Sequence, residues 1–408
     1  MVQTASTMQD QKLLYAVAFT RAAATSMIGV LLGIYLAQLG FSEAKIGYVV
    51  GAGLAGAALA SLVSTLFADR HGRRRLLVQL TLLAAAGTLV VISASDALVA
   101  AMAAFFGMLN GTGRDRGAAV ILDQAMLPLV TTNASRTRGF AAYHLWQDAG
   151  HAVGALGAAA PKLAQPYVDA PLEAVNRFAV ASAAALLAIT ALAYWRLSPA
   201  VEAAPNHHEA KVSPPTRRLL WRFSGLIGLD SLGSGFLTTA LLSLFFYKQF
   251  EVDEWILGVL FAGARLANAG SYLAAAELAK RIGLLNTMVF THIPASLLLI
   301  GVGLAPTFEW AAALFLLREA LVEMDVPTRQ SYVMAVVRPE ERTLASGLTH
   351  LVRMTGQAIT PFGAGVFMQN LALATPLFVG AGIKLSYDVA LYFGFRHVKP
   401  PEEAEAGD

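Results

Sequence analysis

This chain has no cysteine and few charged residues. Without cysteine it can form no disulfide, thiolate metal site or thiol nucleophile, which excludes the protein classes that depend on them. Charged residues make up 14% of the chain, against about 25% in soluble domains, whereas hydrophobic residues make up 56%. Water is therefore not the main solvent of this chain, and the composition predicts a membrane protein.

Apolar stretches recur along the whole sequence, and each is long enough to cross a bilayer core of roughly 30 Å as a helix. The longest polar break, residues 198–218, fits a linker between two halves of six helices. We predict an all-α membrane protein with twelve transmembrane helices at residues 13–39, 45–68, 76–95, 97–130, 138–163, 177–196, 219–247, 255–279, 284–305, 308–337, 344–368 and 373–395. The predicted parts are an amino-terminal six-helix bundle (1–197), a cytoplasmic linker (198–218), a carboxy-terminal six-helix bundle (219–396) and a cytoplasmic tail (397–408).

Two short basic segments indicate an internal repeat. Asp69-Arg70-His71-Gly72-Arg73-Arg74-Arg75 and Lys280-Arg281-Ile282-Gly283 each follow one apolar stretch and precede the next. Their glycines are 211 residues apart (283 − 72), and the dipeptides Ile46-Gly47 and Leu257-Gly258 have the same offset (258 − 47). Two anchors at one spacing predict that the second half of the chain repeats the first, as two pseudo-symmetric bundles.

Lysine and arginine are distributed unevenly between the loops. Of the 30, 18 lie at the amino terminus, in alternate loops, in the linker or in the tail, whereas Lys45, Lys162, Arg177 and Lys248 lie in the other loops. Because cytoplasmic loops carry the excess of positive charge, both termini are predicted to be cytoplasmic, in a bacterial-type inner (plasma) membrane. Most of the basic residues lie between spans, so no nucleic-acid partner is predicted.

With twelve spans, a six-plus-six repeat and these basic hairpins, the chain resembles the major facilitator superfamily (MFS) over nearly its whole length. The family pattern after span two is a glycine, three residues, Asp-Arg, any residue, a glycine and basic residues. The residues that fit it are Asp69, Arg70, Gly72, Arg73 and Arg74. Thr65 stands where the leading glycine is expected. The resemblance implies the MFS fold, and a cytoplasmic charge lock that stabilises the outward-facing state; the alternative is a simple topological anchor.

Two glycine-rich stretches lie inside predicted spans. Gly150, Gly154 and Gly157 partly match a span-five pattern of antiporter members of the family, although Ala155 replaces its proline. The match favours export, but small residues at this spacing also serve helix packing. The stretch 51–56 spells the dinucleotide-binding pattern GxGxxG inside span two, with no preceding strand, so we interpret it as a helix-packing surface.

Ionisable residues inside the predicted spans are the main functional signal. Each costs at least about 2.5 kcal/mol on insertion scales, so it must face protein or a wet cavity. These residues are Arg21, Arg114, Asp115, Arg116, Asp123, Asp148, Asp230, Arg265, Arg318, Glu319, Glu323, Asp325, Arg329, Arg353, Lys384 and Asp388. By resemblance, spans one, four, five, seven, eight, ten and eleven border the central cavity, and nearly all these charges lie on them. The pattern predicts a polar translocation path.

Span five carries the sharpest local pattern. His144, Gln147, Asp148 and His151 stand at i, i+3, i+4 and i+7, so they share one helix face. An offset of 206 relates this stripe to span eleven, and we expect one stripe on each wall of the cavity. The equivalent positions are His350, Arg353 and Gln357. Three roles stay open: proton transfer by Asp148 with a histidine, a two-histidine, one-aspartate divalent-metal site, and a buried network that only holds helices together.

Other candidates lie in spans one, four, seven, eight and ten. Arg114 and Arg116 suit a carboxylate or phosphate and so an anionic or zwitterionic solute, with cytoplasmic-side ion pairing as an equal alternative. Arg116 and Asp123 share a face. The remaining candidates are Asp230 as a proton or substrate carrier, Glu319 as a second carrier or an arginine partner, Arg265 as a solute-charge partner, and Arg21 as the partner of a substrate charge or an acid.

Lys384 and Asp388 stand at i and i+4 in span twelve, and we expect them to neutralise each other outside the site. Methionine and aromatic side chains along the spans are interpreted as lipid contacts and packing. The sequence does not show a binding site for ATP.

We therefore expect a proton-coupled secondary active transporter, not an enzyme, that moves a small polar or anionic organic solute by alternating access. The expected partners are this solute, protons and the lipid bilayer, with the monomer as the functional unit. A proton gradient would supply the energy, and no cofactor or metal is predicted. We expect efflux by antiport, and the alternatives are proton-symport uptake, divalent-metal export and a non-transporting membrane sensor or scaffold.

Overall fold

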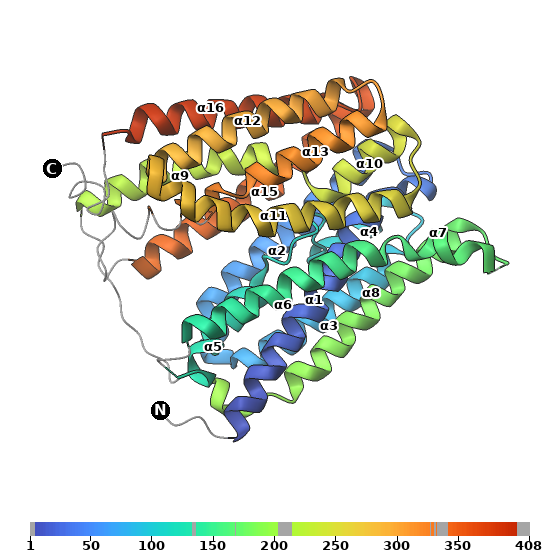
Figure 1. Ribbon diagram of the computed structural model, residues 1–408. Helices are drawn as coiled ribbons and strands as arrows, with labels where there is room; N and C mark the ends of the chain where they lie inside the picture. The colour runs from blue at the N-terminus through green and yellow to red at the C-terminus, as the bar shows by residue number, and fades with distance from the viewer. Residues whose placement is uncertain are drawn as a thin grey trace. The chain divides into compact units, whose positions relative to one another are not determined.

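The computed structural model describes residues 5–132, 136–167, 169–202, 214–326, 328–329, 332 and 342–397. The regular elements of these residues are helices (Figure 1). They are α1 (Ala5–Gln38), α2 (Glu43–His71), α3 (Arg73–Val91), α4 (Ala97–Phe106), α5 (Ala118–Val130), α6 (Arg136–Gly157), α7 (Ala160–Ala164), α8 (Leu172–Trp195), α9 (Pro214–Gly235), α10 (Thr239–Phe250), α11 (Glu254–Ile282), α12 (Leu284–Leu304), α13 (Phe308–Val322), α15 (Arg342–Asn370) and α16 (Thr375–Phe395), with 3₁₀ turns η1 (Gln165–Tyr167) and η2 (Pro199–Val201).

In the part of the chain that the structure describes, the predicted spans fall on these helices and several of them are broken; span five, for example, is divided into α6 and α7. Span four is divided into α4 and α5 by the non-helical residues 107–117, and span seven is divided into α9 and α10. Segments long and apolar enough to cross a membrane on length and composition alone are Ser6–Gln38, Glu43–Ala68, Arg73–Val91, Leu172–Trp195, Trp221–Phe250 and Leu284–Leu304. The all-helical membrane fold predicted from the sequence is confirmed.

The chain divides into two compact units whose borders differ from those of the predicted bundles. Unit 1 comprises Met1–His207, Thr238–Ala262 and Pro361–Asn370, and unit 2 comprises His208–Leu237, Gly263–Thr360 and Leu371–Asp408. Helix α10, the start of α11 and the end of α15 therefore belong with the first eight helices. Most of the predicted linker (203–213) and tail (398–408) lie outside the described residues.

Helix α1 is the central element of unit 1 and packs against α6, α8 and α10 (Figure 1). Its contact with α6 depends on the glycines of span five. A Cβ atom at Gly150 would lie 2.3 Å from the carbonyl oxygen of Phe19, and one at Gly154 would lie 2.0 Å from that of Ala23. These glycines let two helix backbones touch, so in this structure they serve helix packing.

The glycines of the repeated basic segments both have a positive φ. Gly72 separates α2 from α3 with φ = 93°, and Gly283 separates α11 from α12 with φ = 85°. A positive φ favours glycine because it has no Cβ atom. The shared positive φ at an offset of 211 residues supports the internal repeat that the sequence predicts.

Each unit has its own apolar core. In unit 1, Leu14, Leu77 and Met126 pack with two buried tyrosines, Tyr143 and Tyr194. The core of unit 2 comprises Phe223, Ile227, Leu285, Met288, Val289, Tyr332, Tyr387, Leu391 and Phe395. Many large apolar side chains elsewhere are exposed, for example on α8, as expected of helices that face lipid rather than water.

The glycines of α2 offer a test of the packing. A Cβ atom at Gly56 would lie 1.8 Å from the carbonyl oxygen of Phe105 in α4, so Gly56→Ala should separate the two helices and destabilise the fold by about 1–3 kcal/mol. Gly270→Ala in α11 is the matched control, because nothing lies within 4 Å of its added Cβ atom. Thermal unfolding in detergent should show a lower midpoint for Gly56→Ala alone; equal midpoints would contradict the packing of α2 on α4.

Candidate functional site

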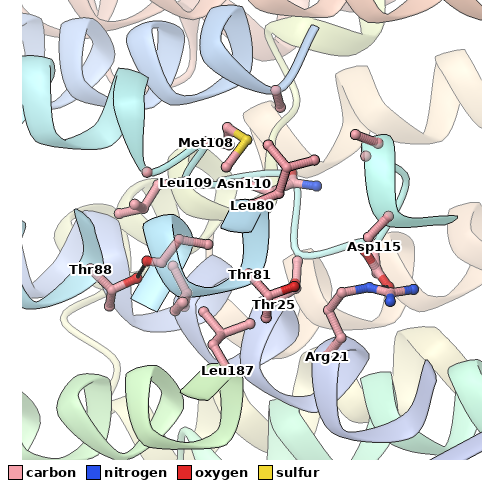
Figure 2. Close-up of a pocket in the computed structure, with 17 residues that line it drawn as sticks. Arg21, Thr25, Leu80, Thr81, Thr88, Met108, Leu109, Asn110, Asp115 and Leu187 are labelled. Carbon is pink, nitrogen blue, oxygen red and sulfur yellow. Dashed lines mark hydrogen bonds and ion pairs between the residues drawn. The ribbon is translucent and has the colours of Figure 1, made fainter. Parts of the chain in front are cut away.

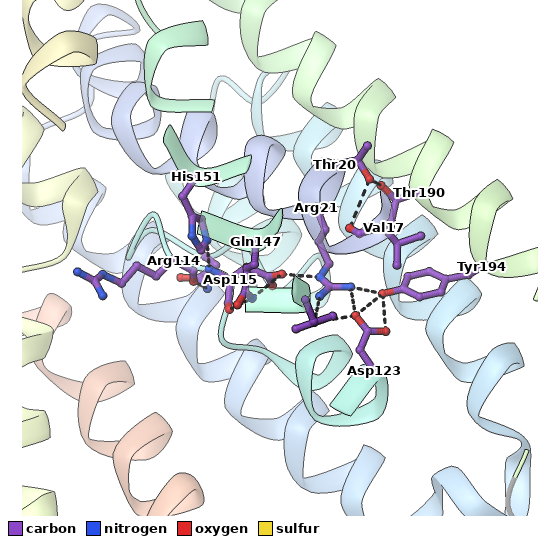
Figure 3. Close-up of polar contacts among 12 residues, drawn as sticks. Val17, Thr20, Arg21, Arg114, Asp115, Asp123, Gln147, His151, Thr190 and Tyr194 are labelled. Atoms are coloured by element: carbon purple, nitrogen blue, oxygen red, sulfur yellow. Dashed lines mark hydrogen bonds and ion pairs between the residues drawn. The ribbon is translucent and has the colours of Figure 1, made fainter. Parts of the chain in front are cut away.

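The charged centre of unit 1 is built around Arg21 on α1. Its Nε atom lies 2.7 Å from a carboxylate oxygen of Asp115, and its Nη1 atom lies 2.9 Å from one of Asp123. All three side chains are buried. Asp115 belongs to the non-helical segment of span four and Asp123 to α5, so Arg21 ties this segment and α5 to span one (Figure 3).

Two tyrosines complete this cluster. Tyr143 of α6 and Tyr194 of α8 each donate a hydrogen bond to Asp123, at 2.9 Å, and each accepts one from Arg21. Both side chains are fully buried. The rings of both tyrosines pack in the core of unit 1, as predicted for aromatic residues, and their hydroxyl groups in addition bind Asp123. Their spacing along the chain gives no signal of the contact, because it depends on how α6 and α8 pack around α1.

Polar backbone groups of the break in span four find hydrogen-bond partners both within the break and on a neighbouring helix, as hydrocarbon surroundings require. Asn110 accepts from the backbone N–H of Thr112 and donates to the carbonyl of Arg114, at 3.0 and 2.6 Å. Helix α10 supplies two further donors: the backbone N–H of Ala240 to the carbonyl of Gly111, at 2.9 Å, and the hydroxyl of Thr239 to the carbonyl of Thr112, at 2.6 Å. The break is therefore a defined structural element, held in place by hydrogen bonds within it and to α10.

The span-five stripe divides into two pairs. Gln147 and His151 are buried against the break: Gln147 donates to the carbonyl of Asp115 at 3.0 Å, and Nε2 of His151 accepts from the Asp115 N–H at 2.9 Å. His144 is exposed and lies beside Gln147, at 3.4 Å. The Asp148 side chain is 45% exposed, with an oxygen 3.8 Å from Nδ1 of His151. One helix face thus carries both a buried anchor and a half-exposed carboxylate.

Arg114 and Arg116 belong to the break and are only partly buried. In Figure 3 the Arg114 side chain points away from Arg21 and Asp123. Asp123, which the sequence places on the same face as Arg116, is bound to Arg21 of α1. The Arg114 side chain therefore lies apart from the buried cluster of Arg21.

A cavity of about 90 Å³ lies beside this cluster within unit 1 (Figure 2). Arg21, Asp115 and Asn110 form part of its wall, with threonines from α1 and α3 and apolar side chains around the rest. That volume is enough for several water molecules, and the charged and hydroxyl groups supply hydrogen-bond partners for them. The break of span four is thus next to a space that its polar groups can share with water.

Unit 2 has a second buried charged cluster, centred on Asp230 of α9. One Asp230 oxygen lies 2.7 Å from Nζ of Lys384 in α16, and the other lies 3.3 Å from Arg329 and 3.8 Å from Arg353 of α15. Arg329 is also paired with Asp325, at 3.0 Å. Arg353 keeps 20% of its side chain exposed, whereas the other groups are buried.

The arrangement around Asp230 corrects one expectation. Lys384 and Asp388 do not serve as each other's main partner: Lys384 binds Asp230, and Asp388 binds Nδ1 of His292 on α12 at 2.8 Å. Spacing of i and i+4 allows two side chains to meet, but partners on other helices are closer here. Lys384 therefore belongs to the charged cluster from which the sequence analysis excluded it.

The other candidates of unit 2 lie on α11, α13 and α15. Glu319 is buried, is paired with its neighbour Arg318 and accepts from the amide of Asn268 at 2.9 Å, which agrees with its interpretation as an arginine partner. Arg265 is buried in α11, and both His350 and Gln357 are partly buried on α15. Because the span-five stripe belongs to unit 1 and this stripe to unit 2, their expected opposition across a cavity stays a prediction.

The loop after span two contains one partner that the sequence analysis missed. The carboxylate of Glu202 accepts from the backbone N–H groups of Arg73 and Arg74, at 2.8 and 3.1 Å, and so caps the first turn of α3. The Arg74 side chain donates to the carbonyl of Leu197 at 2.7 Å. Arg70 is exposed, and the side chain of Asp69 lies outside the described part of the structure. The charge lock therefore stays a prediction.

Among the residues that the structure describes, no three His, Asp or Glu side chains are grouped closely enough to hold a metal ion. Nε2 of His151, one of the ligands of the metal alternative, already accepts a backbone hydrogen bond. In this conformation that nitrogen is therefore not available to a divalent metal.

Comparisons with known proteins agree on the fold. The family model described as Major Facilitator Superfamily matches residues 14–361. An uncharacterized membrane protein of Saccharomyces cerevisiae, YJR124C, is 24% identical over 94% of this chain and 93% of its own length. Among solved structures, the match to a point mutant of the nucleoside transporter NupG covers 95% of this chain and 100% of the NupG chain, with 15% identity and a TM-score of 0.76. The match to a D-xylose-proton symporter covers 95% of this chain and 98% of the symporter, with 12% identity and a TM-score of 0.70. The match to the human organic anion transporter MFSD10 covers 95% of this chain and 100% of MFSD10, with 14% identity and a TM-score of 0.62.

The cluster of Arg21 predicts a rescue between two helices. Arg21→Gln leaves two buried carboxylates without their cation and should destabilise the protein by about 3–5 kcal/mol. Adding Asp123→Asn removes one of those charges and should restore part of the loss, measured by thermal unfolding in detergent. Arg177→Gln, at an exposed arginine of α8, is the control and should change little. A double variant no more stable than Arg21→Gln would contradict the pairing.

The cluster of Asp230 predicts an energetic coupling that is specific to one carboxylate. Lys384→Met should destabilise the protein by about 1–3 kcal/mol, because Asp230 loses a buried donor at 2.7 Å but keeps Arg329 and Arg353. In double-mutant cycles measured by thermal unfolding, Lys384→Met and Asp230→Asn should be coupled, whereas Lys384→Met and Asp388→Asn should be additive. Coupling to Asp388 alone would support the pairing within α16 that the sequence suggests.

Proposed function

This chain belongs to the major facilitator superfamily and is a multi-pass membrane transporter rather than an enzyme, and we propose that it is a proton-coupled secondary active transporter. It would move a small polar or anionic organic solute by alternating access between the two sides of the membrane. The proposed direction is efflux by antiport. We place it in a bacterial-type inner membrane, as a functional monomer with both termini in the cytoplasm.

The observation that carries this proposal is the sharing of Arg21 by two buried carboxylates. Burying charge inside membrane helices is costly, so such groups are retained where they act on a solute or a proton. Counted over Arg21, Asp115 and Asp123, the cluster has one negative charge more than positive. A proton, or a cationic group of the solute, would balance that charge.

Asp148 remains the proposed entry point for the proton in unit 1. Its carboxylate is half exposed, so water can reach it, and it lies 3.8 Å from the ring of the buried His151. Carboxylates and histidines of this kind make proton relays inside membrane proteins. His144 and Gln147 extend the same face and are proposed to line its approach.

Unit 2 supports an anionic solute. Around Asp230, the cations Lys384, Arg329 and Arg353 outnumber the carboxylates of Asp230 and Asp325 by one. Arginine offers paired N–H donors to a carboxylate or phosphate, and Arg353 is the partly exposed member of the cluster. We propose Arg353 as the contact for the negative group of the solute, with Arg265, Arg114 and Arg116 as further partners and Asp230 as a carrier.

The names of the structural neighbours suggest where to look for the solute. NupG is a nucleoside transporter, MFSD10 an organic anion transporter, and another neighbour a D-xylose-proton symporter. At 12–15% identity they share the fold alone. A first panel of labelled nucleosides, pentoses and dicarboxylates covers these three chemical classes.

Three other functions are separable by experiment. Uptake by proton symport would use the same residues in the opposite direction. A divalent-metal exporter would lose metal tolerance in His144→Ala with His151→Ala while organic fluxes are unchanged. A non-transporting sensor or scaffold would show no change in any flux after Asp148→Asn or Asp230→Asn.

The test is solute flux in proteoliposomes with an imposed pH gradient. With the panel above, we expect flux of at least one compound to follow the gradient, and an antiporter should drive the compound into an acidic lumen. Asp115→Asn and Asp148→Asn should each lower gradient-driven flux by about tenfold or more, while counterflow of the solute without a gradient persists. Glu309→Gln, at an exposed carboxylate of α13, is the control. Solute flux through the unmodified protein that does not depend on the pH gradient would rule out proton coupling.

A further inference from the structure

The unwound part of span four, residues 107–117, is held by α6 at Asp115. The backbone N–H of Asp115 donates to Nε2 of His151, and the backbone carbonyl of the same residue accepts from Gln147. The two backbone groups of a single residue are thus both held by α6. At the other end of the break, α10 holds the carbonyls of Gly111 and Thr112.

The contact with Asp115 fixes the protonation pattern of the His151 ring. A neutral imidazole has one N–H donor and one bare nitrogen that accepts, whereas the imidazolium ion has two donors and no acceptor. Because the Asp115 N–H is always a donor, Nε2 must be bare, and the single proton resides on Nδ1. That nitrogen is the one that lies 3.8 Å from the carboxylate of Asp148.

We infer that His151 is a positioning residue through which a proton releases the broken segment of span four. When the ring takes a second proton, Nε2 becomes a donor and can no longer accept from the Asp115 N–H. The same proton gives the ring a positive charge beside Asp148, which strengthens the contact on the Nδ1 side. The hydrogen bond from the Asp115 N–H to His151 is lost, while the bond from Gln147 to the Asp115 carbonyl and the contact of the ring with Asp148 remain.

The charges around His151 fit this role. Asp148 comes from α6 itself, Asp115 and Arg114 come from the broken segment, and Arg21 comes from α1. Asp148 is half exposed and supplies a path for the proton, while the His151 ring is buried, so its hydrogen bond is shielded from competing water. Histidine is also the side chain that ordinarily changes charge near neutral pH.

Release of Asp115 would act on the charged centre of unit 1. The carboxylate of Asp115 is one of the two that hold Arg21, so a shift of its backbone changes the hydrogen bonds of Arg21 to span four. The cavity beside Asn110 and Asp115 gives the segment room to move (Figure 2). This inference rests on the proton coupling proposed above and deepens it by naming how one proton reaches a moving element.

The test is hydrogen–deuterium exchange of peptides from residues 107–117, measured in nanodiscs without any solute and corrected for the intrinsic pH dependence of exchange. In the unmodified protein, exchange at pH about 5.5 should be about tenfold faster than at pH about 8, a change equivalent to about 1.4 kcal/mol of protection. Peptides from α2 serve as the internal reference.

Two variants at one position separate the cause. His151→Gln keeps an acceptor at every pH, so exchange should be slow at both values; His151→Phe keeps the ring shape without an acceptor, so exchange should be fast at both. His71→Gln, at an exposed histidine at the end of α2, should leave the pH dependence unchanged.

Faster exchange of His151→Gln in acid would show that another group releases the segment and would overturn the inference. A lack of pH dependence in the unmodified protein would overturn it too. The exchange experiment uses no solute, so its result does not depend on the result of the flux experiment. The failure of this inference can therefore be distinguished from the failure of proton coupling.

Discussion

The shared grip of Arg21 on Asp115 and Asp123 is the interaction on which unit 1 depends. A guanidinium buried among membrane helices requires acceptors for most of its N–H groups, and here they come from three other spans. Two carboxylates and two tyrosine hydroxyls supply them. The position of α5, of the broken segment, of α6 and of α8 around α1 is therefore set by one cation as much as by apolar packing.

This demand explains why span four is interrupted. Asp115 lies in the break and Asp123 lies within α5, yet both carboxylates meet the same arginine. Leaving the helical path frees the chain to bring Asp115 close, and the exposed backbone groups then find partners in Asn110, α6 and α10. The break is therefore the structural consequence of bringing two acids to one base.

Much of the fold follows from the sequence. Bilayer thickness sets the length of an apolar helix, and the repeated glycines align the second half of the chain with the first. Gly72 and Gly283, predicted as equivalent from spacing alone, both adopt a positive φ between two helices. The family membership rests on the same pattern and is confirmed. The glycines of span four are the only sequence feature that points to the break in it. The sequence does not show which neighbouring groups would form hydrogen bonds with an unwound backbone.

The candidate site was less predictable, since its partners come from different helices. Periodicity placed His144, Gln147, Asp148 and His151 on one face but could not separate the buried pair from the more exposed one. It also paired Lys384 with Asp388, whereas each has its partner on another helix. The side chains of Tyr143, Tyr194 and Glu202 carry no local pattern at all, because a single hydroxyl or carboxylate becomes informative only when its neighbours in space are known.

The cavity behind Asn110 also bears on how this protein would respond to compression. Space that side chains and water do not fill adds volume to a folded arrangement, so hydrostatic pressure favours an arrangement in which such space is filled. Since the cavity borders the unwound segment, pressure would act on how side chains and water pack against this segment.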